Sequence, residues 1–174
     1  DILDYALLSA PGAPLKQALL DAKIGKDIMA SFDSYTLQPM LSIVAKNSNL
    51  ERKDEFLSII RKVLEEQVRQ GINKKSLLAG INSFEFRYRE ADYGSYPKGL
   101  MFGIKCLDSW LYDDGQPFLH LEELEIIEYL KQQVEKGYFE ELVQKYLLDN
   151  PHAAVVIARP EYGLNTRKEE ALAK

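Results

Sequence analysis

The chain has 174 residues, of which 46% are hydrophobic and 28% charged, and its formal net charge is −5, a composition that suits one globular domain with a hydrophobic core. Basic residues are scattered singly and no apolar run approaches the roughly 20 residues of a membrane span, so we expect neither a nucleic-acid partner nor a membrane helix. The single cysteine, Cys106, excludes an internal disulfide framework.

The N-terminal region predicts two short helices. Apolar residues at helical spacing begin at Ile2, with neither an initiator methionine nor a signal peptide before them. We therefore expect the chain to begin inside a helix and to be a piece of a longer protein, truncated on its N-terminal side. Residues 11–14 break this helix, and Pro14 is well placed to begin a second helix that runs to about Ala22 and is terminated by Gly25.

Three segments have the composition of β-strands. Residues 26–36 and 38–46 are rich in β-forming side chains, and residues 37–39 could form the tight turn of a hairpin. Both alternating faces of the second segment are largely apolar, which predicts burial on both sides. Residues 153–158 predict a third, returning strand that is stopped by Pro160.

Apolar residues at steps of three and four predict five helices between Phe56 and Leu147. The first ends at Gly71, the second is capped by Asn73, and Gly137 ends the fourth. The apolar stripe of the third helix consists of Leu100, Ile104, Leu107 and Leu111, with Cys106 and Trp110 beside it.

Two strands, a block of helices and a returning strand predict an α+β fold, in which helices pack on one face of an antiparallel sheet. We expect residues 1–159 to form this single domain, incomplete at its N-terminus. Residues 160–174 are polar and are predicted to be a linker tail toward the next region.

Five strings of residues, in order along nearly the whole chain, resemble the second domain of the presequence-protease branch of the pitrilysin and insulinase zinc metallopeptidases. These strings are residues 10–15 (APGAPL), 84–92 (FEFRYREAD), 96–100 (YPKGL), 107–112 (LDSWLY) and 147–152 (LLDNPH). The resemblance implies a parent protein of two bowl-shaped halves, each built from two related α+β domains, that enclose a chamber where unstructured peptides are cut. It also implies a zinc ion in the first domain, held by an inverted HxxEH motif whose glutamate is the catalytic base.

This chain lacks the zinc motif. HxxEH needs two histidines four residues apart, whereas the two histidines here are His120 and His152. No zinc ligand or catalytic residue can therefore be transferred from the family, and we expect no cofactor in this piece. The resemblance implies a non-catalytic structural and substrate-chamber domain, whose partners are the remaining domains of the peptidase and its peptide substrates. The alternative is a free-standing peptide-binding module of the same fold with no peptidase partner domain.

The densest polar and aromatic cluster supplies the candidate site. Such clusters can grip peptides or line an interface between domains, and the alternative is a charged helix face closed by pairs such as Glu85 with Arg89. The candidates for a domain-interface or chamber-lining role are Arg87, Tyr88, Arg89, Asp92, Tyr93 and Tyr96.

Three other residues carry reactive groups. His120, followed by Glu122 and Glu123, could ligate a metal with help from elsewhere, but a surface histidine at a helix start is the simpler interpretation. Cys106 is predicted to pack as a small apolar side chain, and His152 to lie in a turn. The family resemblance is compatible with the cytoplasm or periplasm of a bacterium, of which the cytoplasm is favoured, and with an organelle in a eukaryote.

Overall fold

The computed structural model describes residues 1–34 and 36–173, and it confirms the predicted α+β class. The helices are α1 (Ile2–Asp4), α2 (Pro14–Asp21), α3 (Lys53–Gln70), α4 (Lys74–Glu90), α5 (Lys98–Trp110), α6 (Glu123–Gln133), α7 (Tyr138–Val143) and α8 (Leu164–Leu172). Two π-helical segments, η1 (Tyr5–Ser9) and η4 (Gln144–Leu148), extend α1 and α7, and two 3₁₀ turns are η2 (Leu50–Arg52) and η3 (Leu119–Leu121). The strands are β1 (Asp27–Asp33) and β2 (Met40–Lys46).

The two strands form an antiparallel hairpin whose register runs from Asp27 opposite Lys46 to Asp33 opposite Met40. One face of the hairpin meets α1, η1 and α2, where Ile28 is almost completely buried. The prediction that β2 is buried on both sides is wrong. Met40 and Val44 are 55% and 47% exposed, because the helices cover only one face of the hairpin. The predicted first strand ends at Asp33 rather than residue 36, and residue 35 lies outside the described residues.

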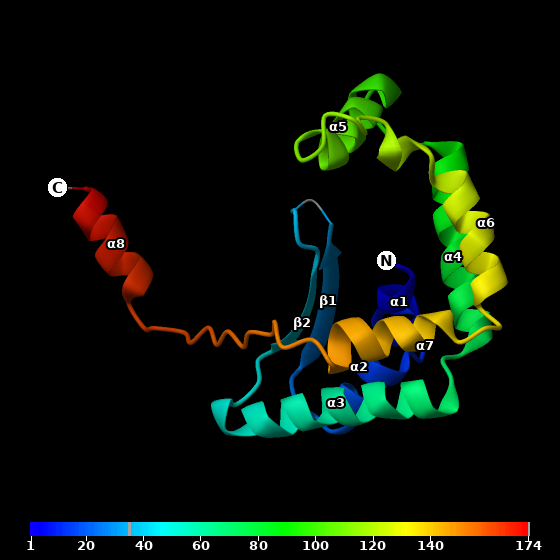
Figure 1. Cartoon of the computed structure of the whole chain (residues 1–174). Coiled ribbons are helices and arrows are strands. Elements are labelled where there is room, and N and C mark those ends of the chain that lie inside the picture. Colours follow the sequence, from blue (N-terminus) through cyan, green and yellow to red (C-terminus); the bar gives the residue numbers. More distant parts are fainter. Residues whose placement is uncertain (35, 174) are drawn as a thin grey trace.

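The hydrophobic core lies among η1, α2, β1, α3, α4, α6 and α7. Its most deeply buried side chains include Leu7, Leu15, Leu19, Leu77 and Ile81. Figure 1 shows α3 and α7 at one end of the molecule, and α4 and α6 side by side leading away from them to α5. This arrangement places α5 at the far end of the α4–α6 pair, away from the core.

The predicted helix boundaries follow from local chemistry. Pro14 occupies the start of α2, and the Asn73 side chain accepts a hydrogen bond from the backbone N–H of Ser76 at 3.1 Å, which caps α4. Gly71 ends α3 with a φ of 90°, a conformation that favours glycine. The helices predicted on both sides of this turn are therefore confirmed.

The predicted third strand at residues 153–158 is wrong. This segment is extended but forms no strand in the structure, and Val156 is 90% exposed. Its β-branched side chains favour an extended backbone, yet a strand also needs backbone hydrogen bonds to a neighbouring strand, and residues 153–158 pair with neither β1 nor β2. In the predicted linker tail, the structure has helix α8, which projects from the rest of the chain in Figure 1. Each helix in the described part of the chain is too short or too polar to span a lipid bilayer.

Candidate domain-interface site

The six candidate residues lie around the junction between α4 and α5. Arg87, Tyr88 and Arg89 belong to the last turns of α4, whereas Asp92, Tyr93 and Tyr96 lie in the loop that leads to α5. The structure brings them to one end of the molecule but gives them different neighbours, so they do not form a single closed pocket.

Tyr88 joins α4 to the segment before α6. Its hydroxyl donates a hydrogen bond to the backbone carbonyl of Leu121, and the ammonium group of Lys105 on α5 lies 5.3 Å from the centre of its ring. Lys105 also forms an ion pair with Glu123 at 3.3 Å. Tyr88 is therefore a point of contact among three segments that are distant in the sequence.

Arg89 forms the predicted pair with Glu85, with 2.7 Å between Nη2 and Oε1. The second oxygen of Glu85 accepts a hydrogen bond from Lys131 on α6 at 2.6 Å, so this carboxylate ties α4 to α6. The hydrogen bond from Lys131, and after it that from Arg89, holds the pKa of Glu85 below its usual range, and the hydrogen bond to Glu85 raises the pKa of Lys131. The sequence indicated the pair within α4 but gave no signal for Lys131, 46 residues away.

The remaining candidates are held less tightly. The Arg87 guanidinium lies 6.0 Å from the centre of the Phe84 ring on its own helix. Asp92 accepts a hydrogen bond from the backbone N–H of Gly94 at 2.9 Å, which closes the turn after α4. Tyr96 is 63% exposed. The side chains of Arg87 and Tyr96 are therefore available to a neighbouring surface. That of Asp92 is available as well, although one of its oxygens is already bonded within the turn.

Tyr93 connects the loop to α5. Its ring meets that of Phe102 edge to face, with 6.0 Å between the ring centres. The same side of α5 carries Cys106, which is buried as predicted, and Ser109, whose hydroxyl donates a hydrogen bond to the backbone carbonyl of Gln116 at 2.8 Å. One side of α5 is thus fixed to the chain.

The two histidines lie apart from these contacts. His120 is in η3, and the nearby Glu123 is engaged by Lys105. His152 follows η4, and its backbone N–H donates a hydrogen bond to the side chain of Asn150 at 2.8 Å, which confirms the predicted turn. Across residues 1–34 and 36–173, no group of three or more histidine, cysteine or acidic side chains is arranged to hold a metal ion.

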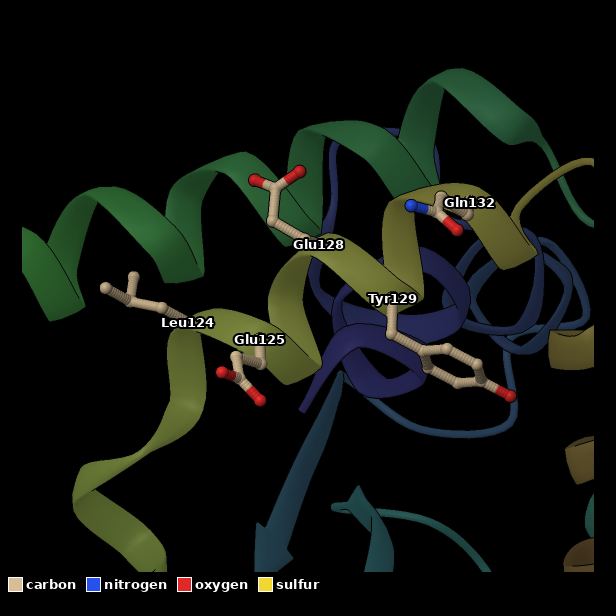
Figure 2. Close-up of a pocket in the computed structure, with 5 residues that line it drawn as sticks. All are labelled: Leu124, Glu125, Glu128, Tyr129 and Gln132. Atoms are coloured by element: carbon tan, nitrogen blue, oxygen red, sulfur yellow. The ribbon is translucent and has the colours of Figure 1, made fainter.

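A shallow hollow of about 400 Å³ lies on the outer side of α6. Figure 2 shows that the five labelled lining side chains all come from this one helix: Leu124, Glu125, Glu128, Tyr129 and Gln132. A surface formed by one helix encloses no ligand, since binding sites for small molecules are concave and bury most of the ligand. The hollow is therefore a weaker candidate site than the α4–α5 junction.

Comparisons with known proteins extend the sequence resemblance. No family model matches the chain. It is 42% identical over 174 residues to Protein HypA of Clostridium perfringens, a match that covers 100% of this chain and 18% of that protein. It is 28% identical over 172 residues to Presequence protease 1, chloroplastic/mitochondrial, of Arabidopsis thaliana, and 28% identical over 179 residues to the mitochondrial presequence protease of Aspergillus fumigatus.

The chain spans less than a fifth of the length of these relatives. The matches cover 96% and 99% of this chain but only 16% of each of the two presequence proteases. Over nearly its whole length the chain therefore resembles one part of a presequence protease, in the pitrilysin and insulinase metallopeptidase family.

Proposed function

We propose that this chain is a non-catalytic structural and substrate-chamber domain of a longer zinc metalloendopeptidase that degrades unstructured peptides. The observation that carries the proposal is the match of nearly the whole chain to only 16% of the presequence proteases. A segment that is matched throughout, within a much longer relative, is expected to work as one part of a multidomain enzyme.

The chemistry of the sequence favours the second, inactive domain of such an enzyme. The histidines His120 and His152 are too far apart in the sequence to form HxxEH, and the strings that resemble the family belong to its second domain. In this proposal the zinc ion and the catalytic base lie in the first domain of the longer protein, and this chain contributes shape and surface.

We propose that the candidate residues of the α4–α5 junction contribute to this role. Tyr88 and Tyr93 contact α5 at the α4–α5 junction and Arg89 pairs with Glu85 within α4, whereas Tyr96 and Arg87 are exposed. We assign the exposed side chains to a contact with a neighbouring domain or with peptide in the chamber, because tyrosine and arginine contribute most to such contacts. The compartment would follow the source, as cytoplasm in a bacterium or organelle in a eukaryote.

One observation favours a second candidate, the free-standing peptide-binding module. The hairpin of β1 and β2 is the whole sheet among the described residues, so each strand has one edge free of backbone partners. An extended peptide could add to such an edge through main-chain hydrogen bonds.

A comparison of the longer protein with the isolated chain tests both candidates. We expect the complete reading frame that encodes this chain to contain HxxEH, and its product to bind zinc and to cleave an unstructured peptide until a chelator removes the metal. The 174-residue chain alone should show no cleavage. A reading frame without HxxEH would contradict the proposal and leave the peptide-binding module, and chelator-sensitive cleavage by the isolated chain would contradict both.

A further inference from the structure

Helix α5 exposes a continuous apolar stripe. Leu100, Ile104, Leu107 and Leu111 follow one another at steps of four, three and four residues, which places them on one face of the helix. Their exposed fractions are 52%, 44%, 42% and 70%. Trp110, beside the stripe, is 51% exposed, and no charged residue interrupts it.

The opposite face of α5 is fixed to the chain. Phe102 meets Tyr93, Lys105 pairs with Glu123, and Ser109 bonds to the carbonyl of Gln116. These contacts determine which way the helix is turned. The stripe therefore faces solvent because the contacts of the opposite face orient the helix. Its exposure is not the result of α5 lacking contacts with the chain.

Two glycines along the edge of the stripe supply an independent observation. Gly99 and Gly103 lie within α5, where glycine is a poor helix former, and a Cβ atom added at either position would meet no neighbouring atom within 4 Å. Packing within this chain therefore does not require glycine at either position. Small residues four apart on a helix allow another helix backbone to approach closely, and a partner at this edge would account for them.

We propose that the stripe of α5 is a docking face for a helix from another part of the longer protein. The inference rests on the proposed function for the existence of that protein. Residues at steps of three and four fit the ridges and grooves of a partner helix, so the partner should carry an apolar face with the same spacing. More than four fifths of Protein HypA lies outside the match, which leaves ample chain to supply it.

The accessibility of engineered thiols tests the docking face. In a Cys106→Ala background, Ile104→Cys and Leu111→Cys are introduced separately into the longer protein and into the 174-residue chain, with Lys62→Cys on the exposed side of α3 as control. Rates of modification by a maleimide are compared with those in denaturant. We expect both α5 thiols to react at least about tenfold more slowly in the longer protein than in the isolated chain, since a docked site reacts only when it opens.

Each outcome has a separate meaning. Equal modification rates in the two proteins overturn the inference. A second overturning result is slow modification of the isolated chain together with a dimer in light scattering, if Leu107→Lys restores fast modification. The partner of the stripe would then be a second copy of the chain. Zinc-dependent peptide cleavage is measured on the same preparations. If the longer protein cleaves peptide but its α5 thiols react as fast as in the isolated chain, only the docking face is contradicted. If the thiols are protected but no peptide is cleaved, the proposed function is contradicted and the docking face is supported.

Discussion

Glu140 shows how one carboxylate fixes a turn that lies far from it in the sequence. Its Oε1 accepts a hydrogen bond at 2.7 Å from the backbone N–H of Ile72, which is 3% exposed in the turn between α3 and α4. A buried backbone donor without a partner is costly, so α7 supplies the acceptor that this turn lacks. The turn leads directly to Asn73, the residue that caps α4.

Glu140→Ala should lower the free energy of unfolding by about 1.5–3 kcal/mol, the range for losing a hydrogen bond to a charged group and leaving the donor buried. Glu140→Gln keeps an acceptor oxygen and should cost less. Urea unfolding of the isolated chain, followed by circular dichroism, measures both changes. Equal losses in the two variants would show that the side chain acts through packing instead of this hydrogen bond.

At the scale of elements, the chain contains regular structure that its own core does not use. Helix α5 buries Cys106 and Ser109 but leaves its apolar stripe in solvent, and residues 153–158 lie extended without a partner strand. Propensity and periodicity determine whether such segments form, whereas burial requires an opposing surface. Under the proposed function, the remainder of the longer protein would supply the surfaces that pack against both segments.

Gly103→Leu should have opposite effects in the two contexts. In the isolated chain it should raise the free energy of unfolding by about 0.5–1 kcal/mol, because leucine is a better helix former and the position is open. In the longer protein the added side chain should collide with the docked helix and lower the melting temperature. Gly103→Ala, which adds one methyl group, is the matched control. A gain in both proteins would argue against a partner at this edge.

At the scale of the whole molecule, stability is concentrated at one end. The core cluster joins η1, α2, β1, α3, α4, α6 and α7, whereas α5 lies at the far end of the α4–α6 pair and packs mainly against η3. Segments with few buried apolar contacts open more easily than the core. The chain should therefore unfold locally at α5 before it unfolds globally.

Hydrogen exchange of the isolated chain should reveal this gradient. Amides of α2 and of the first half of α4 should exchange only through global unfolding, and those of α5 should exchange at least about tenfold faster. Mass spectrometry of peptic fragments measures the difference. Uniform exchange would mean that α5 is as stable as the core, and the same experiment on the longer protein should show α5 protected.

Local signals predicted much of the fold. Gly71 and Asn73 gave the turn between α3 and α4, and the pair of Glu85 with Arg89 was predicted from its spacing of four residues. The bond between Glu85 and Lys131 could not be predicted, because nothing in the local sequence indicates which distant lysine will lie opposite. The candidate residues lie at the end of α4 and in the following loop, and their neighbours are decided by the packing of α4 against α6 and α5.

The sequence by itself determined the α+β class, the main helices, the hairpin and the resemblance to part of a presequence protease, because these depend on periodicity, capping residues and matched strings. The tertiary structure decided which apolar surfaces are covered. It left one face of β2, residues 153–158 and the stripe of α5 exposed. The physical reason is that a hydrophobic pattern states which side of an element avoids water, whereas burial depends on a second surface that only the folded chain, or a partner, can bring to it.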